Sequence, residues 1–314
     1  MNGSSHKAAG SRRSPPPSKT DILCSVSEGL IGPVNGRYHI EALLGVGGMG
    51  AVYRARDKVT GGKVALKLIR EDLLEHEELA ARFRREARAA SRIDHPHVTR
   101  VLDFGQDERN RAFIVMELVE GPLLSQAIAL QGRFSVERAL HILGQLARAL
   151  AAAHACQVIH RDLKPGNVVL AHYRDELEHV KILDFGLAKI QGLDSTSVVT
   201  PLGETFGTAE YISPEQAADL PLDHRADIYS FGVLAFELLT GQVPFTGDTV
   251  DVVTAHVHRP PPRPSEVALD QGISPGLEAM VLRCLAKQPD ERYASADDLA
   301  RVIDDLCTPP APQR

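Results

Sequence analysis

His160-Arg161-Asp162-Leu163-Lys164-Pro165-Gly166-Asn167 lies near the middle of the chain, and Asp184-Phe185-Gly186 follows 17 positions after Asn167. Short strand-like runs flank both groups, at residues 158–159, 168–170 and 180–183. Around these runs, helical patterns dominate from Leu123 onward, and residues 139–155 carry the clearest of them. The two polar groups therefore belong to a mainly helical part of the chain that contains a few short strands.

The region before Leu123 has a different texture. Its strand-like runs are Ala51-Val52-Tyr53, Val64-Ala65-Leu66, Val101-Leu102 and Phe113-Ile114-Val115. One helical segment, over about residues 73–93, interrupts them. A strand-rich part followed by a helix-rich part predicts an α+β protein with two unequal lobes.

The composition of both ends predicts tails around one globular unit. The chain has 314 residues, of which 43% are hydrophobic and 24% charged, so it can bury a sizeable core. Residues 1–36 are rich in Ser, Pro and Gly, and residues 307–314 contain three prolines, so we expect disorder in both segments. The globular unit is then 37–306, with lobes at 37–118 and 119–306.

Charge and cysteine content exclude several classes of protein. With 35 Lys plus Arg against 41 Asp plus Glu, the net charge of −6 argues against binding to nucleic acid. No apolar run approaches the roughly 20 residues that cross a membrane, so we expect no membrane insertion. The four cysteines lie far apart without a C-x-x-C pair, which argues against structural zinc and for a reducing, cytoplasmic setting.

A glycine-rich stretch, Leu44-Gly45-Val46-Gly47-Gly48-Met49-Gly50-Ala51-Val52, contains the pattern G-x-G-x-x-G. Glycines let a backbone approach phosphates closely because no Cβ intervenes, although a plain glycine-rich hairpin is the alternative. A dinucleotide-binding fold needs a helix after the loop, whereas residues 51–56 are strand-like. A Walker P-loop needs Gly-Lys-Ser/Thr, which does not follow, so both of these nucleotide folds are disfavoured.

Lys67 lies inside the apolar run Val64-Ala65-Leu66-Lys67-Leu68-Ile69, where an unpaired charge costs desolvation. It could instead face solvent from an edge strand. A partner is available on the helical segment that follows, whose apolar stripe from Leu79 to Ile93 also includes Glu86. We therefore predict an ion pair between Lys67 and Glu86.

Five motifs in this order resemble those of the protein kinases, in particular the eukaryotic-like serine/threonine kinases of bacteria. They are the glycine loop, Val-Ala-Leu-Lys at 64–67, His-Arg-Asp-Leu-Lys-Pro-Gly-Asn at 160–167, Asp-Phe-Gly at 184–186 and Gly-Thr-Ala-Glu-Tyr-Ile-Ser-Pro-Glu at 207–215. The resemblance covers about residues 38–305. It implies a bilobal fold, with a small strand-rich N-lobe and a larger helical C-lobe. It also implies transfer of the γ-phosphate of ATP to Ser or Thr hydroxyls of protein substrates in bacterial signalling.

Catalytic roles carry over to this sequence residue by residue. Asp162 resembles the catalytic base, and Lys164 resembles the residue that contacts the γ-phosphate. The resemblance implies that Lys67 holds the α- and β-phosphates of ATP and that Glu86 positions Lys67. Thr208 resembles the hydroxyl residue that supports the catalytic loop in serine/threonine kinases.

Metal and nucleotide contacts carry over in the same way. Asn167 and Asp184 resemble the ligands of Mg²⁺, for which Mn²⁺ could substitute, because both side chains offer hard oxygen donors. Met116 resembles the gatekeeper residue that precedes the hinge. The resemblance places ATP against Leu44, Gly45, Val46, Gly47, Gly48, Met49, Gly50, Val52, Ala65, Lys67, Glu117, Val119 and Val169.

Two further assignments from the resemblance are structural. Glu215 should pair with Arg292, and Asp227 should hold the backbone around His160. Either acid could instead be an ordinary surface charge. Asp227, however, begins an apolar helical pattern, where a carboxylate should have a partner.

The loop between residues 184 and 215 is the expected site of autophosphorylation, for which transient dimerisation is one route. In the family that the sequence resembles, an arginine directly before the catalytic aspartate usually receives this phosphate, which implies the same role for Arg161. A guanidinium fork can bind the phosphate oxygens and so order a loop. Among the hydroxyls of the loop we favour Thr200 and Thr205. Glu204 could partly substitute for a phosphate and leave basal activity without modification.

Two other functions share part of this pattern. A pseudokinase would bind partners without chemistry, but such proteins generally lose the equivalents of Lys67, Asp162 or Asp184, all of which are present. A small-molecule kinase shares the catalytic aspartates but should lack the 207–215 segment, which resembles a platform for peptide docking. The protein kinase interpretation therefore accounts for more of the sequence.

Overall fold

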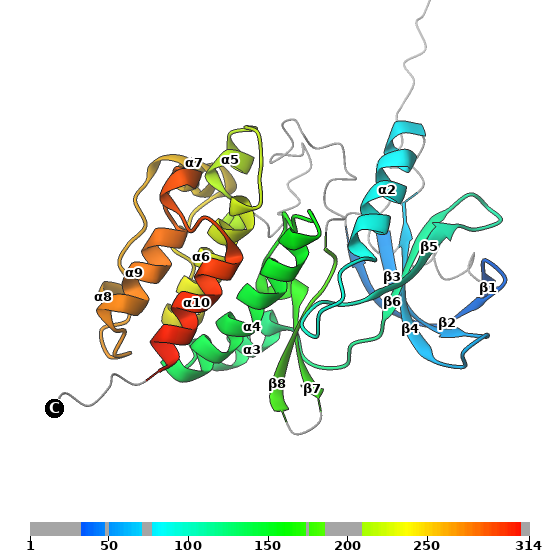
Figure 1. Cartoon of the computed structure of the whole chain (residues 1–314), viewed down its shortest axis with the longest axis horizontal. Coiled ribbons are helices and arrows are strands. Elements are labelled where there is room, and N and C mark those ends of the chain that lie inside the picture. Colours follow the sequence, from blue (N-terminus) through cyan, green and yellow to red (C-terminus); the bar gives the residue numbers. More distant parts are fainter. Residues whose placement is uncertain (1–32, 48–49, 71–76, 174–175, 186–208, 309–314) are drawn as a thin grey trace, which may run out of the picture.

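The computed structural model describes residues 33–47, 50–70, 77–173, 176–185 and 209–308. Within these residues the chain forms the two unequal lobes that the α+β pattern predicts, and the lobes lie side by side along the long axis (Figure 1). A sheet with one helix forms the smaller lobe. Helices and a two-stranded hairpin form the larger lobe.

The smaller lobe contains a six-stranded antiparallel sheet with the strand order β1-β2-β3-β4-β6-β5. The strands are β1 (Pro33–Val34), β2 (Tyr38–Gly47), β3 (Gly50–Asp57), β4 (Lys63–Ile69), β5 (Val101–Gln106) and β6 (Ala112–Glu117). The first strand begins inside the segment expected to be a disordered leader, because Pro33 and Val34 pair with β2 and Val34 is buried. Residues 1–32 lie outside the described part, so the disorder expected there stays a prediction.

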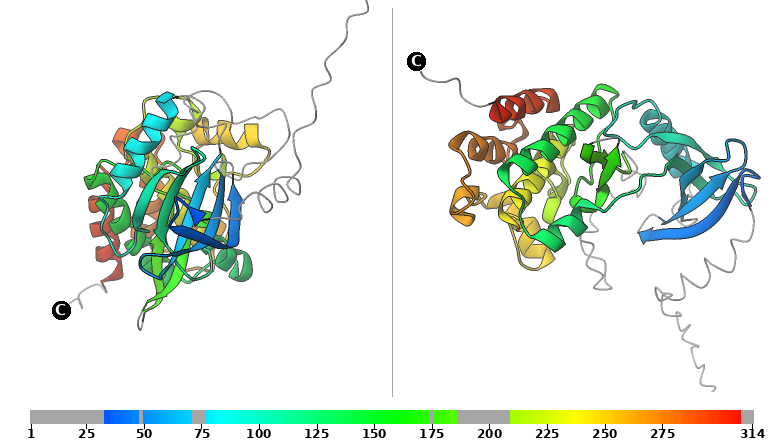
Figure 2. Two further views of the ribbon diagram at one scale, coloured as in Figure 1. Left: turned by 90° about the vertical axis from the view of Figure 1, so that its right-hand side faces the viewer. Right: turned by 90° about the horizontal axis from the view of Figure 1, so that it is seen from below.

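Strand β4 is buried on both faces, and the alternation of its side chains shows on which face Lys67 lies. Side chains alternate along a strand, so residues 64, 66 and 68 pack into one apolar cluster while residues 65 and 69 pack into another. The second cluster includes Phe83 and Ala87 of α2 (Glu77–Ala90), which covers that face of the sheet (Figure 2). By alternation, Lys67 lies on the face covered by α2.

The larger lobe is built around α6 (Arg225–Thr240), which is buried along nearly its whole length. The other helices are α3 (Leu124–Gln131), α4 (Val136–Ala155), α5 (Pro214–Ala217), α7 (Thr249–His258), α8 (Pro264–Val267), α9 (Pro275–Cys284) and α10 (Ala296–Cys307), with short 3-10 turns η2 (Pro165–Asn167), η4 (Ala209–Tyr211) and η5 (Pro289–Glu291). The hairpin strands are β7 (Val168–Tyr173) and β8 (Glu176–Ile182). Residues of α4, α6, α9 and α10 share one large core cluster.

The structure departs from the expected elements at two further places. Residues 158–159, expected as a strand, form no strand: the N–H of Val158 bonds back to the carbonyl of Ala153 in α4, at 3.0 Å, and Val158 is buried in the main core. The last helix runs through Cys307, one residue past the expected globular unit. The strands expected at 168–170 and 180–183 form the β7–β8 hairpin, which confirms that expectation.

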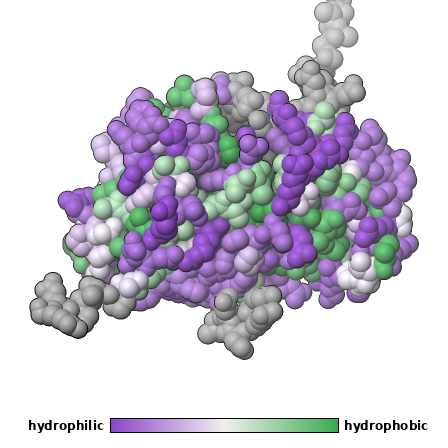
Figure 3. All heavy atoms as spheres, in the orientation of Figure 1, coloured by the Kyte–Doolittle hydropathy of each residue, from purple (hydrophilic) through white to green (hydrophobic). Residues whose placement is uncertain are grey.

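In the described ranges, no helix combines the length and the apolar character that crossing a membrane requires. Hydrophilic side chains predominate on the face seen in Figure 3, and apolar residues lie between them.

Candidate active site

The catalytic loop (residues 160–167) brings three of the expected site residues into direct contact. The ammonium of Lys164 lies 2.9 Å from Oδ1 and 2.8 Å from Oδ2 of Asp162. The amide nitrogen of Asn167 donates to the backbone carbonyl of Asp162 at 2.7 Å and to its Oδ2 at 3.0 Å. Asp162 is therefore held from its side chain and its backbone by the two residues that the sequence placed beside it.

A buried carboxylate on α6 holds the start of this loop. Asp227 is fully buried and accepts backbone hydrogen bonds from His160 and Arg161, each at 2.8 Å. The Nε2 atom of His154 lies 2.8 Å from the same carboxylate. Burial by itself raises the pKa of Asp227, but the hydrogen bond and charge of His154, with smaller contributions from His160 and the Arg161 N–H, bring the pKa below its usual value. The expected role of Asp227 is confirmed.

The imidazole of His160 connects the catalytic loop to the segment before Asp184. Its Nε2 atom lies 2.8 Å from the carbonyl of Leu183, and its Nδ1 atom accepts the N–H of Asp162 at 3.2 Å. These partners assign the proton to Nε2, because a carbonyl can only accept. The ring also packs edge-on against Phe185, with centroids 4.8 Å apart. His160 therefore connects residues 160–167 to the segment that contains Asp184.

The β7–β8 hairpin places the two expected metal ligands at neighbouring strand ends. Val168 pairs with Ile182, so Asn167 and the residues just after Ile182 lie beside each other. The N–H of Leu183 donates to the carbonyl of Asn167 at 2.8 Å. Asp184 follows with a left-handed φ of 56°, uncommon for a residue other than glycine. The hairpin therefore brings together an amide and a carboxylate separated by 17 positions.

Lys67 pairs with a carboxylate of the other lobe. Its ammonium lies 2.8 Å from Oδ2 of Asp184, and Lys67 is only 6% exposed. The predicted pair with Glu86 is not among the ion pairs of the described residues. Glu86 is half-buried on α2 and has contacts of its own. The expectation that this buried lysine is paired is correct, but in this structure its partner comes from the hairpin instead of from α2.

The apolar residues expected around the nucleotide base fall into two groups. Val52, Ala65 and Met116 share the apolar cluster on the α2 side of the sheet, where Lys67 also lies. Val169 is buried on β7 and forms a bridge with Leu123, so it belongs to the larger lobe. The segment from Glu117 to Leu123, with Val119 half-buried within it, connects the two groups.

The described residues of the glycine-rich stretch lie on the paired strands β2 and β3, where Gly47 pairs with Gly50. Gly50 has a φ of 147°, and a Cβ there would lie 1.9 Å from the carbonyl oxygen of Leu68, so the fold itself requires glycine. Cβ atoms at Gly45 and Gly47 would meet nothing within 4 Å. Packing within the described fold therefore does not require glycine at Gly45 or Gly47.

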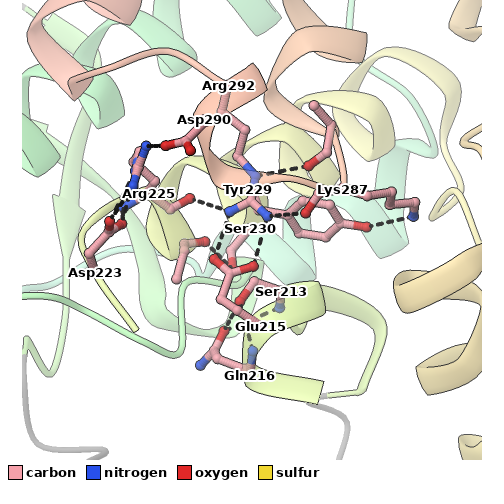
Figure 4. Close-up of polar contacts among 12 residues, drawn as sticks. Ser213, Glu215, Gln216, Asp223, Arg225, Tyr229, Ser230, Lys287, Asp290 and Arg292 are labelled. Atoms are coloured by element: carbon pink, nitrogen blue, oxygen red, sulfur yellow. Dashed lines mark hydrogen bonds and ion pairs between the residues drawn. The ribbon is translucent and has the colours of Figure 1, made fainter. Parts of the chain in front are cut away.

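The segment around α5 is anchored by a fully buried ion pair. Both oxygens of Glu215 accept from the guanidinium of Arg292, each at 2.7 Å. The remaining donors of Arg292 bond to the carbonyls of Ala286, Arg225 and Lys287 at 2.8 to 3.0 Å, so its whole fork is satisfied (Figure 4). The predicted pair is confirmed.

Comparison with known proteins agrees with this arrangement. The sequence model described as "Protein kinase domain" matches residues 38–302. The chain belongs to the protein kinase family. Members of this family use ATP with a divalent metal ion. The match begins in β2 and ends in α10, so it covers both lobes of the kinase domain.

Curated relatives of the kinase domain are bacterial serine/threonine-protein kinases. It is 46% identical over 263 residues to pkn3 of Myxococcus xanthus, covering 83% of this chain and 48% of that protein. It is 40% identical over 274 residues to PknB of Mycobacterium tuberculosis and 38% over 275 residues to PrkC of Bacillus subtilis, covering 85% and 87% of this chain and 43% and 41% of those proteins. The chain therefore spans less than half the length of each of these relatives.

A solved structure also resembles the kinase domain. The PknI kinase domain of Mycobacterium tuberculosis superposes with a TM-score of 0.68 at 28% identity, covering 87% of this chain and 98% of that one. The bilobal α+β architecture predicted from the motif order is thus confirmed.

Several predicted residues of the kinase domain cannot be placed. Gly48, Met49, Thr200, Glu204, Thr205 and Thr208 lie outside the described residues. Their expected roles in nucleotide contact, phosphorylation and support of the catalytic loop stay predictions.

The sequence analysis missed two contacts of the kinase domain. Lys181 of β8 lies 2.6 Å from Oε1 of Glu117, which also accepts the N–H of Arg100 at 3.0 Å. The side chain of this expected hinge residue is therefore a structural connection between the lobes. The second joins His154 of α4 to Asp227 across 73 positions, with Nε2 of the imidazole 2.8 Å from the carboxylate. No local pattern signals contacts at such separations.

Proposed function

We propose that the chain is an ATP-dependent serine/threonine protein kinase that phosphorylates other proteins in bacterial signalling. The observation that carries the proposal is the contact of Asp162 with Lys164 and Asn167, on a loop connected to Asp184, which in turn pairs with Lys67. The bacterial serine/threonine-protein kinases that match the chain support the same class of reaction.

Asp162 is assigned as the catalytic base. The oxygen of a substrate Ser or Thr hydroxyl attacks the γ-phosphorus of ATP, its proton passes to the carboxylate of Asp162, and the bond to the β,γ-bridging oxygen breaks to release ADP. Lys164 sits against the carboxylate and keeps a positive charge beside the transferred group. Asn167 restrains the same carboxylate, so its orientation toward the hydroxyl is set before substrate binds.

The donor set at Asn167 and Asp184 suits a hard divalent cation. Asn167 uses its amide nitrogen on Asp162, which leaves its Oδ1 for a ligand role, and Asp184 supplies a carboxylate. Oxygen donors of this kind fit Mg²⁺, and Mn²⁺ accepts the same set. When bound, the metal would neutralise charge on the phosphate oxygens.

ATP is proposed to lie between the sheet and β7. Gly45 and Gly47 have no packing reason to be glycine, so close approach of their backbone to phosphates is the reason we assign. Leu44 and Val46, on the same strand β2, are each 50% exposed and would be covered by the nucleotide. Lys67 would exchange the carboxylate of Asp184 for the α- and β-phosphates.

Phosphorylation between residues 187 and 208 is proposed as the regulatory step, with Thr200 and Thr205 as acceptors. Arg161 supports this idea, because its Nε is buried and has no hydrogen-bond partner in the part of the chain that is described. A phosphate carries about −1.5 to −2 charge and three acceptor oxygens, which would satisfy this guanidinium. Transient pairing of two chains would allow the transfer, and a cytoplasmic location is proposed with it.

The test is incubation of the purified chain with labelled ATP and Mg²⁺, with dephosphorylated casein as acceptor, for wild type and Asp162→Asn. Wild type should incorporate label into Ser and Thr. Asp162→Asn should bind ATP with unchanged affinity, unfold at the same temperature and lose transfer by about a hundredfold or more. Near-wild-type turnover in Asp162→Asn would remove the assignment of the base. A wild-type chain that binds ATP but transfers nothing, to casein or to itself, would favour the pseudokinase alternative.

A further inference from the structure

Gln216 reaches from α5 back to the catalytic loop. Its Nε2 donates to the backbone carbonyl of Arg161 at 2.8 Å, a contact across 55 positions. The residue follows Glu215 directly, and the ion pair of Glu215 with Arg292 anchors this turn in the core (Figure 4). Arg161 immediately precedes the proposed base, Asp162. One side chain thus connects the 213–216 turn to the peptide that carries Asp162.

The orientation of the Gln216 amide is set by its neighbours. Its Oε1 accepts from the N–H of Ser213 at 3.2 Å and from the hydroxyl of Ser213 at 3.0 Å, and Ser213 is fully buried. Together with the bond from the Gln216 N–H to the Ser213 hydroxyl, this is a capping box at the start of α5. A flipped amide would place an oxygen against the Arg161 carbonyl, so the NH₂ group must face Arg161.

The peptide that receives this bond is in an unfavourable conformation. Arg161 has a left-handed φ of 68°, which persists in a non-glycine residue only when the surroundings determine it strongly. On its amino side, the N–H of Arg161 is held by Asp227 at 2.8 Å. On its carbonyl side, the bond that the structure provides comes from Gln216. The two contacts restrain both ends of the residue before Asp162.

We propose that Gln216 is a positioning residue, which holds the peptide between Arg161 and Asp162 and so keeps the carboxylate of Asp162 aligned with its substrate. This inference rests on the proposed kinase activity. Without the bond, this peptide keeps the bond from the Asp162 N–H to Nδ1 of His160, at 3.2 Å, but its carbonyl is released. The peptide plane can then tilt about a strained residue, and Asp162 departs from the geometry that Lys164 and Asn167 maintain. The loss falls on the transfer step, because Gln216 is not among the residues expected to touch ATP.

The experiment compares Gln216→Glu and Gln216→Leu with wild type, using labelled ATP, Mg²⁺ and dephosphorylated casein. The glutamate substitution has the same shape and keeps an oxygen for Ser213, but at neutral pH it sets a carboxylate oxygen against the Arg161 carbonyl. Both variants should lower kcat about tenfold, with the KM for ATP close to wild type. Gln216→Glu should keep the wild-type unfolding temperature, whereas Gln216→Leu should unfold at a lower temperature because it removes the acceptor of the buried Ser213 donors. Gln242→Glu is the matched control, since that side chain is exposed, and it should keep wild-type kcat.

A pH profile separates positioning from general damage. The Arg161 carbonyl, 2.8 Å from the atom that is replaced, disfavours the charged form of the introduced carboxyl and should raise its pKa above the ordinary value of about 4.3. As pH falls from 8 to 5.5, the carboxyl of Gln216→Glu should therefore take up a proton and donate to the Arg161 carbonyl again. The ratio of its kcat to that of wild type should therefore rise several-fold over this range. The same ratio for Gln216→Leu should stay flat.

Three results would overturn the inference or its basis, and they can be told apart. If wild type is active and both variants keep wild-type kcat, Gln216 does not position Asp162. If the variants lose ATP affinity and thermal stability in proportion to kcat, with a flat ratio across pH, the role of Gln216 is structural only. If wild type itself transfers no phosphate, the proposed function fails before Gln216 is tested.

Discussion

The two lobes hold their functional residues by different means. In the larger lobe, the catalytic loop is attached by several short hydrogen bonds to buried groups: Asp227 binds two of its backbone N–H groups, and His160 connects it to Leu183. In the smaller lobe, the register of β4 between β3 and β6 places Lys67, and a single ion pair joins that lysine to Asp184 of the other lobe. One lobe therefore restrains its groups internally, and the other depends on a contact across the lobes.

The hydrophobic cores of the two lobes also differ, and the larger lobe again has the more extensive contacts. The larger lobe has one continuous apolar cluster in which α6 is almost wholly buried, whereas the sheet of the smaller lobe separates two small clusters. A large, dense core resists rearrangement, because shifting one element disturbs many contacts. We infer that the catalytic loop is held rigidly while the partner of Lys67 can be exchanged, and four predictions test this difference.

The largest expected effect is on the anchor of the larger lobe. Arg292→Met should lower the free energy of unfolding by about 3–5 kcal/mol, because it leaves the buried carboxylate of Glu215 unpaired. Urea unfolding measures this change. Arg301→Met is the matched control, since its pair with Asp298 is exposed and should contribute less than about 1 kcal/mol. Equal losses of unfolding free energy in the two variants would mean that the buried Glu215–Arg292 pair stabilises the larger lobe no more than an exposed pair does.

The second prediction concerns the smaller lobe. Lys67→Met should lower kcat/KM about a hundredfold and Glu86→Gln about tenfold, and the double variant should lose little more than Lys67→Met alone. The small additional loss in the double variant is expected if Lys67 leaves Asp184 and pairs with Glu86 when ATP binds. A double-mutant cycle on kcat/KM measures the coupling, with Arg84→Gln on the exposed face of α2 as control. Additive losses would mean that Lys67 and Glu86 never meet, so that Asp184 is the lasting partner of Lys67.

The third prediction sharpens the description of the larger lobe, at His256 beneath η4 and α5. His256 is fully buried with its Nδ1 2.9 Å from the hydroxyl of Tyr229, and burial, with the nearby charge of Lys287, lowers its pKa to about 4. Between pH 6.5 and 4, His256 binds a proton in the unfolded chain but stays neutral in the folded chain. The free energy of unfolding therefore falls as pH falls.

Thermal unfolding of wild type and His256→Gln should show this effect. The unfolding temperature of wild type should fall several degrees further than that of the variant between pH 7 and pH 5, since about 1 kcal/mol shifts it by about 2–4 °C in a domain of this size. His258→Gln, at an exposed position of the same helix, should follow wild type. If both variants follow wild type, His256 protonates in the folded state and this part of the lobe is less closed than its burial indicates.

The smallest effect is expected from the proposed phosphorylation between residues 187 and 208. Replacing Thr200 and Thr205 with Ala should lower activity several-fold, and in an Arg161→Ala background the same replacement should have no effect. Mass spectrometry after incubation with ATP checks whether either threonine carries phosphate. Fully active alanine variants, without phosphate between residues 187 and 208, would leave the buried Nε of Arg161 without its proposed ligand.

Much of the site was predictable because the catalytic motifs are local in sequence. Asp162, Lys164 and Asn167 are separated by only two and three positions, so a short loop is enough to bring them together. The pairs Glu215–Arg292 and Asp227–His160 were expected from the family's motifs and are present. The apolar run at residues 64–69 also indicated that Lys67, if buried, needs a partner.

Only the tertiary structure decided which groups meet across the fold. Lys67 pairs with Asp184 and not with Glu86, although the helical stripe favoured Glu86, because the distance between two lobes is not encoded in any local period. The contacts of Gln216 with Arg161 and of His154 with Asp227 join residues 55 and 73 positions apart. Sequence patterns specify which face of an element is apolar and which residue types can do chemistry. Packing of one element against another determines which atoms of those residues come within hydrogen-bonding distance.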